Sequence, residues 1–436
     1  MINFAEWIGW KVFYWLNRLV DLRTPVSHSV SVTTAVEQSG STGPDIWVFC
    51  STIGELNACR PLIEKLSSQG RLTLITDRQC YLESFQQQFP TAAVIELTGA
   101  ITDCEQLIPQ ISPDLLVVCE IPAKPNDAPC RLSYGLLRGA KRAGSKLFLV
   151  NAWLYHYLPS CRMDRIERRW FTRAYLALFD HVTVQTQQVA DELVADGLAV
   201  DKVTVSGNMK FDALKQHSGD SLNTTSRALI EQLNGVETPV FVAGCLASLE
   251  ESGQLLEVLK KVKQTMPGVL VVLAPRHPEN KAFMAAFLEQ LEASNLTYLR
   301  KSDLIETALD SCDCLVLDTF GELKNFYAAA DVCYVGCNHN VLEPLSFGKP
   351  TLISGDWNPI YPSYPVYHLT KARGLVQEAE SMDELERLLR TYLEGQQTAD
   401  RSVVRQQLDD LAGAADISYR RIQQDLKSVD NNLNIQ

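Results

Sequence analysis

One continuous stretch, residues 318–350, carries the residue types that would hold a nucleotide. The string Gly321-Glu322-Leu323 predicts the start of a helix, whose free backbone N–H groups could bind a phosphate. A polar turn follows the next apolar run and contains Glu343, close to the start of another helix. A carboxylate there could accept hydrogen bonds from both hydroxyls of a ribose. The stretch therefore predicts a site for a nucleotide or a nucleotide sugar.

Three other polar side chains follow apolar runs and have a chemical as well as an ordinary interpretation. Glu55 opens a predicted helix after the first run, where it could act as general base towards a hydroxyl or merely favour the helix dipole. Lys210, in the segment VSGNMKFD, could meet a phosphate or carboxylate, or be a solvated surface lysine. Arg276 follows a later run, and a guanidinium suits bidentate contact with an anion.

The elements that must position these residues follow a βαβ pattern. From residue 45 onwards, short apolar runs alternate with amphipathic segments, which predicts parallel sheets covered on both faces. We expect an α/β fold with two Rossmann-like domains, 45–212 and 238–400, joined by an interdomain linker at 213–237. Ligands would bind in the cleft between them, outside the carboxyl ends of the strands. The predicted strands occupy residues 45–51, 71–77, 92–97, 113–120, 146–152, 181–186, 239–245, 269–275, 296–300, 314–318, 331–336 and 350–354.

The two ends of the chain differ from this pattern. Residues 1–22 are rich in aromatic side chains but contain three charged ones within the apolar part. A bilayer span needs about 20 apolar residues, so an amphipathic anchor helix on a membrane surface fits better, with a helix docked on the protein body as the alternative. Residues 23–44 are predicted as a flexible linker, and 401–436 as a C-terminal helix with a frayed tail.

Composition excludes some classes of function. The 436 residues are 46% hydrophobic and 21% charged, as in globular proteins. A net charge of −12 argues against general nucleic-acid binding, because no overall positive field neutralises phosphates. The twelve cysteines include no CxxC pair, which favours buried free thiols in a reducing compartment over a zinc or disulfide framework.

Residues 131–173 nevertheless concentrate positive charge, with ten lysines and arginines against two carboxylates. Four of the arginines have the spacing of one helical face: Arg162, Arg165, Arg169 and Arg173. This face could meet anionic lipid head groups or a phosphorylated acceptor, or be a solvated and partly salt-bridged surface.

Taken in order, these segments resemble the 3-deoxy-D-manno-octulosonic acid (Kdo) transferases of lipopolysaccharide assembly. The matching strings, within about residues 45–355, are STIGELNACRPLIEKL, LVNAWL, VSGNMKFDAL, LAPRHPEN, LDTFGELKNFYAAADVCYVG and HNVLEPLSFGKPTL. The resemblance implies a two-domain GT-B glycosyltransferase that moves Kdo from CMP-Kdo to a lipid A precursor or other anionic glycolipid. It also implies a place at the cytoplasmic face of the inner membrane, peripheral or held by one N-terminal anchor.

Residue roles carry over at the positions that match. Glu55 matches the family's proposed catalytic base, and Glu120 matches the acidic residue that begins its acceptor-side motif. With three arginines of the basic segment, the predicted acceptor-binding set is Glu120, Arg162, Arg165 and Arg169. The predicted CMP-binding set is Lys210, Arg276, Gly321, Glu322, Leu323, Asn340 and Glu343. The resemblance implies no cofactor and no metal, because arginine and helix N–H groups would stabilise the leaving phosphate.

The departures from the family's pattern lie mainly in the loops that face the sugars. Pro122 and Lys124 replace a glutamate and a tryptophan of the acceptor-side motif, and the Asn-Ala-Arg-Leu-Ser string reads NAWLY here. Ala247 stands in place of a histidine, Asn338 of a glycine and Val341 of a proline. We therefore expect a different donor sugar, acceptor or both. The alternatives are a GT-B transferase of another nucleotide sugar, or a non-catalytic homologue that binds lipid or nucleotide.

Overall fold

The computed structural model describes residues 4–21, 43–97, 113–128, 130, 132, 134–214, 224–304, 312–397 and 400–433. They form two compact units, the first comprising residues 1–216 and 411–436 and the second residues 217–410. Each unit is built on a parallel seven-stranded sheet, so the predicted α/β class with two Rossmann-like domains is confirmed. Nearly all of the predicted linker 23–44 lies outside the described residues.

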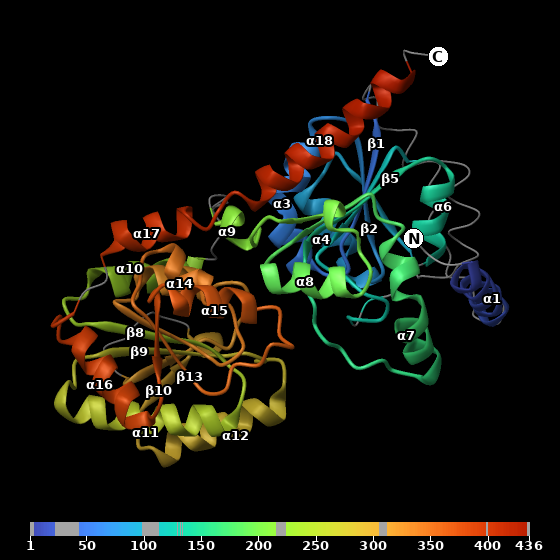
Figure 1. The fold of residues 1–436 in the computed structure, drawn as a ribbon. Helices are drawn as coiled ribbons and strands as arrows, with labels where there is room; N and C mark the ends of the chain where they lie inside the picture. The colour runs from blue at the N-terminus through green and yellow to red at the C-terminus, as the bar shows by residue number, and fades with distance from the viewer. Residues whose placement is uncertain are drawn as a thin grey trace. The chain divides into compact units, whose positions relative to one another are not determined.

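The sheet of the first unit has the strand order β3-β2-β1-β4-β5-β6-β7, with every neighbouring pair parallel (Figure 1). Its strands are β1 (Asp45–Phe49), β2 (Arg71–Thr76), β3 (Ala93–Glu96), β4 (Leu115–Cys119), β5 (Lys146–Ala152), β6 (His181–Val184) and β7 (Val203–Val205). The order reverses between β1 and β4. Such a switch point is where open α/β sheets bind ligands, so the residues just after β1 and β4 face the natural binding position.

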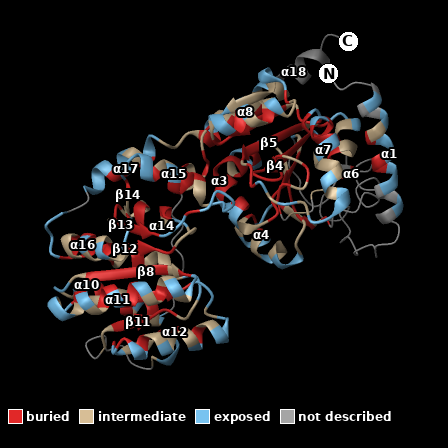
Figure 2. Ribbon diagram, turned by 60° about the horizontal axis from the view of Figure 1, so that its bottom comes forward, coloured by how far each residue is buried: buried red, intermediate tan, exposed pale blue. Residues whose placement is uncertain are grey.

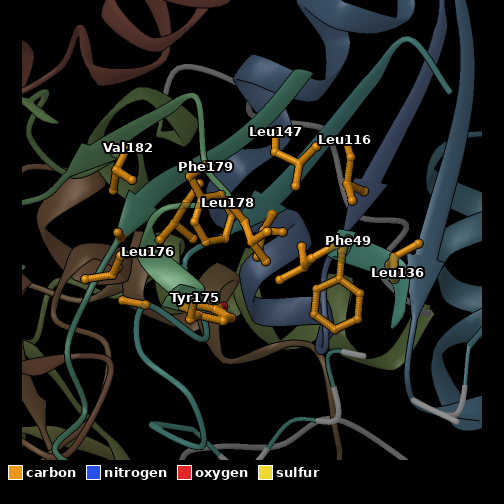
Figure 3. Close-up of a cluster of buried hydrophobic side chains, with 14 of the residues drawn as sticks. Phe49, Leu116, Leu136, Leu147, Tyr175, Leu176, Leu178, Phe179 and Val182 are labelled. Carbon is orange, nitrogen blue, oxygen red and sulfur yellow. The ribbon is translucent and has the colours of Figure 1, made fainter. Parts of the chain in front are cut away.

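Alternate residues of the central strands enter two separate cores. Ile46 and Val48 of β1 belong to one core with α3 (Ile53–Ser67), α4 (Leu82–Gln88) and α18 (Ala414–Leu433). Trp47 and Phe49 belong to the opposite core with α1 (Phe4–Asp21), α6 (Tyr134–Arg142), α7 (Arg162–Leu176) and α8 (Gln187–Ala195). Figure 3 shows Phe49 gathered with leucines of β4, β5 and α6 in this second core. Burial on both faces explains why the strands read as continuous apolar runs.

The second unit has the strand order β10-β11-β9-β8-β12-β13-β14. Its strands are β8 (Val240–Leu246), β9 (Leu270–Pro275), β10 (Tyr298–Arg300), β11 (Cys314–Val316), β12 (Val332–Val335), β13 (Thr351–Ser354) and β14 (Val376–Ala379). Three helices, α11 (Leu249–Thr265), α12 (Lys281–Ala293) and α16 (Met382–Leu393), share one core with this sheet. Figure 2 shows buried strands beneath α11 and α12, whose outer sides are exposed.

Among the described residues of the second unit, the remaining α-helices are α10 (Thr224–Gly235), α13 (Leu323–Ala329), α14 (Leu342–Ser346), α15 (Tyr364–Ala372) and α17 (Arg401–Asp409). Helix α10 occupies part of the segment 213–237 that was predicted as an interdomain linker, and residues 215–223 of that segment lie outside the described residues. The short helix α9 (Lys210–Ala213) belongs to the first unit and follows β7 in the sequence.

The C-terminal segment 401–436, predicted as one helix and a tail, is divided between the units. Helix α17 belongs to the second unit and α18 to the first, where it runs along α3 (Figure 1). The Asp212 carboxylate accepts hydrogen bonds from the N–H groups of Gly413 at 2.9 Å and Ala414 at 3.2 Å, at the start of α18. These bonds satisfy helix N–H groups that have no partner within the helix.

The N-terminal helix α1 packs on the first unit with one side only. Trp10, Phe13 and Tyr14 are buried, and the rings of Phe13 and Phe171 on α7 lie 5.0 Å apart. On the other side, five large apolar side chains are 41–57% exposed: Ile8, Val12, Trp15, Leu16 and Leu19. Within the described part of the chain, no helix has both the length and the apolar character that crossing a lipid bilayer requires.

Candidate active site

The position of Glu55 is determined by the sequence around it. Thr52 caps α3, and its hydroxyl accepts the Glu55 N–H at 3.4 Å. The Glu55 carboxylate returns to accept the N–H groups of Ser51 at 2.6 Å and Thr52 at 3.2 Å. This reciprocal capping box needs only the spacing Thr-x-x-Glu. It fixes a carboxylate at the carboxyl end of β1, next to the switch point of the sheet.

Burial changes the acid strength of this carboxyl group. Glu55 is 5% exposed, and its burial, followed by the nearby charge of Glu120, raises its pKa from 4.5 to about 8. The hydrogen bonds from Thr52 and Ser51 oppose this rise without cancelling it. A carboxylate with a pKa close to working pH is a far better proton acceptor than an ordinary glutamate. The helix-capping and general-base interpretations of Glu55 are therefore compatible.

Glu120, directly after β4, is held by residues from two other segments. Its backbone has a φ of 64°, and its side chain is buried. The carboxylate accepts hydrogen bonds from the Asn151 amide at 3.2 Å and the Tyr155 hydroxyl at 3.3 Å. The Lys210 ammonium lies 3.7 Å from the same carboxylate. The structure thus brings Glu120 and Lys210 together within the first unit, while a contact between Lys210 and a nucleotide stays a prediction.

A buried polar network supports this pair. Asn151, at the end of β5, accepts the Met209 N–H through its side chain at 3.0 Å. Gln185 donates to the Asn151 carbonyl at 2.9 Å and accepts from the Asn208 amide at 2.7 Å. Networks of this kind are rigid when every member is satisfied. The functional interpretation of the sequence missed Asn151 and Gln185, although both are polar residues at the end of an apolar run.

The departures on the acceptor side have structural partners of their own. Tyr155 stands where the family's string has serine and donates to Glu120. Lys124 forms ion pairs with Asp196 at 2.5 Å and with Glu192 at 3.7 Å. The Pro122 carbonyl accepts a hydrogen bond from the buried Tyr175 hydroxyl at 2.6 Å. Each of these three departures therefore has a partner within the first unit.

The predicted basic face is helix α7, and its arginines are of two kinds. Arg168 is partly buried and donates to the carbonyls of Pro125 at 3.2 Å and Tyr157 at 2.6 Å. The other kind is exposed and, among the residues that the structure describes, forms no ion pair with a carboxylate: Arg162, Arg165, Arg169 and Arg173. The alternative of a solvated and partly salt-bridged surface also fits this helix, because Arg168 pairs with Asp127 at 3.5 Å while the other four side chains are exposed.

In the second unit, Arg276, Asn340 and Glu343 gather at the carboxyl edge of the sheet. Arg276 follows β9 and is exposed, while Glu343 lies in the first turn of α14. Burial raises the pKa of Glu343, and a hydrogen bond from Asn340 and the positive charges of Lys324 and Arg276 oppose the rise. The structure brings these predicted residues together and adds Lys324, which sequence reasoning missed although it directly follows Gly321-Glu322-Leu323.

His339, in the same turn, is a neutral imidazole at physiological pH. Burial first, and then the positive charges of Arg276 and His277, lower its pKa to about 4. A neutral imidazole can donate one hydrogen bond and accept another. The edge therefore combines cationic groups, a carboxylate and a neutral ring, which suits an anionic nucleotide.

Glu322 is engaged inside the protein. Its carboxylate accepts the Lys301 ammonium at 2.5 Å and hydroxyl hydrogen bonds from Ser226 at 2.5 Å and Thr319 at 2.8 Å. Although burial opposes the change, these bonds lower its pKa. They fix the start of α13 and favour a structural role for this carboxylate. The preceding Gly321 has a φ of 83°, a conformation that glycine adopts without strain.

Two glycines allow close approaches in this unit, one between β8 and helix α13 and one between the ends of β12 and β8. A Cβ atom on Gly244 would lie 2.0 Å from the Tyr327 hydroxyl oxygen, and one on Gly336 would lie 2.2 Å from the Cys245 carbonyl oxygen. Asn338, which replaces a glycine of the family's pattern, has a φ of 64°. Asparagine tolerates this left-handed conformation better than most residues, so the turn keeps its shape.

Known proteins support this picture of the fold and the family. The family model described as 3-Deoxy-D-manno-octulosonic-acid transferase (kdotransferase) matches residues 28–213. A 3-deoxy-D-manno-octulosonic acid transferase of Chlamydia muridarum is 25% identical over 325 residues, covering 71% of this chain and 70% of that protein. The corresponding transferase of Haemophilus influenzae is 22% identical over 378 residues, 82% of this chain and 81% of that protein.

A bifunctional glycosyltransferase/methyltransferase of Fusobacterium nucleatum is 24% identical over 327 residues, and the match covers 72% of this chain but only 47% of that protein. Among solved structures, a glycosyltransferase of Rickettsia africae superposes with a TM-score of 0.60 at 11% identity, covering 89% of this chain and 99% of that one. A putative UDP-N-acetylglucosamine 2-epimerase of Listeria monocytogenes gives 0.59 at 15% identity, covering 90% and 98%. These two likenesses concern the GT-B-like fold alone. From these sequence matches, the chain is similar to the 3-deoxy-D-manno-octulosonic acid transferases, and the matches to the Chlamydia muridarum and Haemophilus influenzae relatives cover 71% and 82% of it.

Proposed function

We propose that the protein transfers Kdo, or a related sugar, from a CMP-activated donor to a hydroxyl group of a lipid A precursor or another anionic glycolipid. The observation that carries this proposal is Glu55, a buried carboxyl with a pKa of about 8 at the switch point of the first sheet. Beside it, Glu120 is held in a satisfied polar network with Lys210. Such a group suits proton removal from an alcohol near neutral pH.

The proposed step is a single displacement with inversion. Glu55 takes the proton of the acceptor hydroxyl while the oxygen attacks the anomeric carbon of the donor. The bond between that carbon and the CMP phosphate oxygen breaks, and CMP leaves as an anion. In the second unit, Arg276 and Lys324 stabilise the negative charge on the phosphate, and Glu343 accepts hydrogen bonds from the ribose. No metal is required for this charge balance.

Two variants separate catalysis from nucleotide binding. Glu55→Gln is expected to lower transfer by about 10²-fold or more, because an amide cannot accept the proton. Its dissociation constant for CMP, measured by isothermal titration, stays at the wild-type value. Arg276→Met is expected to weaken CMP binding by about tenfold or more, because a charge-assisted contact is lost. Glu64→Gln, on the same helix as Glu55, is the matched control.

Each outcome decides between the alternatives. Full transfer activity in Glu55→Gln would refute the general-base role. Tighter binding of UDP than of CMP by the wild-type protein would favour a GT-B transferase of another nucleotide sugar. If neither nucleotide binds at millimolar concentration, the non-catalytic homologue is the remaining interpretation. A donor and acceptor screen against extracted glycolipids then identifies the sugar.

We also propose that the protein attaches peripherally to the cytoplasmic face of the inner membrane through α1. The exposed apolar side chains of α1 recur at intervals of one to four residues along one stripe, opposite the side that packs on α7. The exposed arginines of α7 belong to the same unit and supply attraction to anionic lipid. An apolar helix face together with a basic surface gives two membrane signals, which stable attachment requires.

Vesicle sedimentation tests this attachment. Val12→Glu/Leu16→Glu is expected to release the protein from vesicles of phosphatidylcholine and phosphatidylglycerol, because charged groups would enter the stripe. Arg165→Glu/Arg169→Glu is expected to weaken binding to the anionic vesicles. The matched control is Val200→Glu, since Val200 is 72% exposed elsewhere in the same unit. Equal sedimentation of all variants would refute attachment through α1.

A further inference from the structure

A basic cavity of about 400 Å³ lies between α7 and the end of α8 in the first unit. The side chains that matter for its charge are Lys124, Arg168, Arg169, Arg173 and Asp196, and Trp170 also lines it. The cavity adjoins the loop that runs from Glu120 through Lys124, because Arg168 donates to the Pro125 carbonyl of that loop. Its volume is that of a small-molecule site.

Two of the cationic groups are already balanced. Arg168 forms an ion pair with the buried Asp127 at 3.5 Å in addition to its carbonyl hydrogen bonds. Lys124 is paired with Asp196 at 2.5 Å and with Glu192 at 3.7 Å. These pairs fix the walls of the cavity and leave its net charge to the remaining arginines.

Arg169 and Arg173 supply that charge. They lie one helical turn apart, both are exposed, and within the described part of the chain neither has a carboxylate partner. Like charges at this spacing destabilise a helix, so nothing in the packing of α7 itself favours the pair. Gly197 makes room for Arg173, because a Cβ atom at Gly197 would lie 2.6 Å from the Arg173 Nε atom.

The remaining feature is an aromatic surface beside the charge. Trp170 is 63% exposed although it is the largest apolar side chain of α7. An indole face that stays in water offers a sugar ring or another flat apolar surface a place to stack. Two guanidinium groups next to it match a phosphate, which accepts parallel hydrogen bonds from arginine.

We propose that this cavity binds the phosphate of a phosphorylated sugar, with Arg169 and Arg173 holding the phosphate and Trp170 contacting the ring. The proposal rests on the proposed function, because there the phosphorylated sugar is the head group of the glycolipid acceptor. Lys124 and Asp196 line this subsite, and Lys124 lies in the same loop as Glu120. Recognition of the phosphate would orient the acceptor while Glu55 acts on its hydroxyl.

A binding assay without any donor tests the subsite independently of transfer. Glucose 1-phosphate, inorganic phosphate and glucose are titrated into the full chain and followed by tryptophan fluorescence and calorimetry. Wild-type protein is expected to bind glucose 1-phosphate more tightly than either other probe. Arg169→Gln/Arg173→Gln is expected to weaken this binding by about tenfold or more. Arg142→Gln/Arg420→Gln, at two exposed arginines of the same unit that do not line the cavity, is the matched control and stays within about twofold.

Further arms distinguish the outcomes. Loss of the fluorescence change in Trp170→Phe supports the ring contact, and equal affinity for inorganic phosphate and glucose 1-phosphate overturns it. The proposed subsite is refuted if both double variants weaken the binding of glucose 1-phosphate equally. It is also refuted if the wild-type protein does not bind glucose 1-phosphate at a concentration of about 10 mM. With a glycolipid acceptor, the cavity variant raises KM for the phosphorylated form and not for its dephosphorylated form. If the protein binds glucose 1-phosphate but transfers no sugar, the subsite is supported and the proposed function is refuted. If it transfers a sugar but does not bind glucose 1-phosphate, the proposed function is supported and the subsite is refuted.

Discussion

Replacing Glu55 by glutamine separates its acidity from its part in the capping box. Glutamine at the third helical position can accept the same backbone N–H groups, so the start of α3 is kept. What the variant removes is the ionisable group. The prediction is that Glu55→Gln is more stable than the wild-type protein at alkaline pH and gains no such advantage at acidic pH.

The direction follows from the raised pKa of Glu55. The native state keeps the Glu55 proton up to about pH 8, whereas an unfolded chain releases it near pH 4.5. The stabilising effect of this proton is therefore fully present below pH 4.5 and is lost as the pH rises through 8. The interval from 4.5 to about 8 corresponds to about 5 kcal/mol at about 1.4 kcal/mol for each pH unit. Because Glu55 is almost fully buried, screening by solvent reduces this free energy only slightly.

Urea unfolding at pH 5 and pH 9 measures the effect. Six of the seven tryptophans belong to the first unit, so tryptophan fluorescence reports mainly on the unit that contains Glu55. The unfolding free energy of the wild-type protein is expected to fall by a few kcal/mol more than that of Glu55→Gln over this range. Glu64→Gln serves as control. Parallel pH dependence of the wild-type protein and Glu55→Gln would refute the reasoning.

Two predictions concern the second unit. Lys301→Met is expected to destabilise the second unit by about 3 kcal/mol, because the Glu322 carboxylate loses its buried cation. The double variant Lys301→Met/Glu322→Gln is expected to recover part of this stability, as measured by thermal unfolding. Gly244→Ala is expected to cost about 1–3 kcal/mol because its Cβ atom would overlap the Tyr327 hydroxyl oxygen. The Cβ atom would also lie 2.7 Å from the Tyr327 Cζ and Leu323 Cδ2 atoms, so adding Tyr327→Phe relieves only the closest overlap. A melting temperature that does not rise at all after this second change would contradict the steric explanation.

Most strands could be predicted from the sequence, because a strand that is buried on both faces of a sheet consists of a continuous run of apolar residues. The first predicted strand, 45–51, covers β1, and the alternate residues of β1 enter the two cores. Strand β7 was not predicted, because it has only three residues and its short apolar sequence continues into a polar segment. The predicted interdomain segment 213–237 contains the boundary between the two units, but its helix α10 was not foreseen because its polar residues conceal the few that are buried, such as Leu229 and Leu233.

The site was predicted less completely, because its pairings join distant parts of the chain. The Gly321-Glu322-Leu323 turn was expected to offer backbone N–H groups to a phosphate, which stays a prediction, but the partner of the Glu322 side chain, Ser226, lies 96 residues away and was not foreseen. Similarly, Asn151 and Tyr155 reach Glu120 across 31 and 35 residues. Glu55 was placed well because its partners, Ser51 and Thr52, are local. Local hydrogen bonding is visible in a sequence, whereas pairing between strand ends depends on the completed sheet.

The return of α18 to the first unit has a consequence for the order of folding during synthesis. Residues 217–410 leave the ribosome before 411–433, so the second unit can complete its sheet while the first lacks part of its core. That missing part is substantial, because Ala414, Ala415 and Ile422 are buried beside β1 and β4. A nascent chain that stops at Asp410 would therefore carry a finished second unit and a first unit with an open apolar surface under α18. The first unit would complete this core only after the final helix has docked.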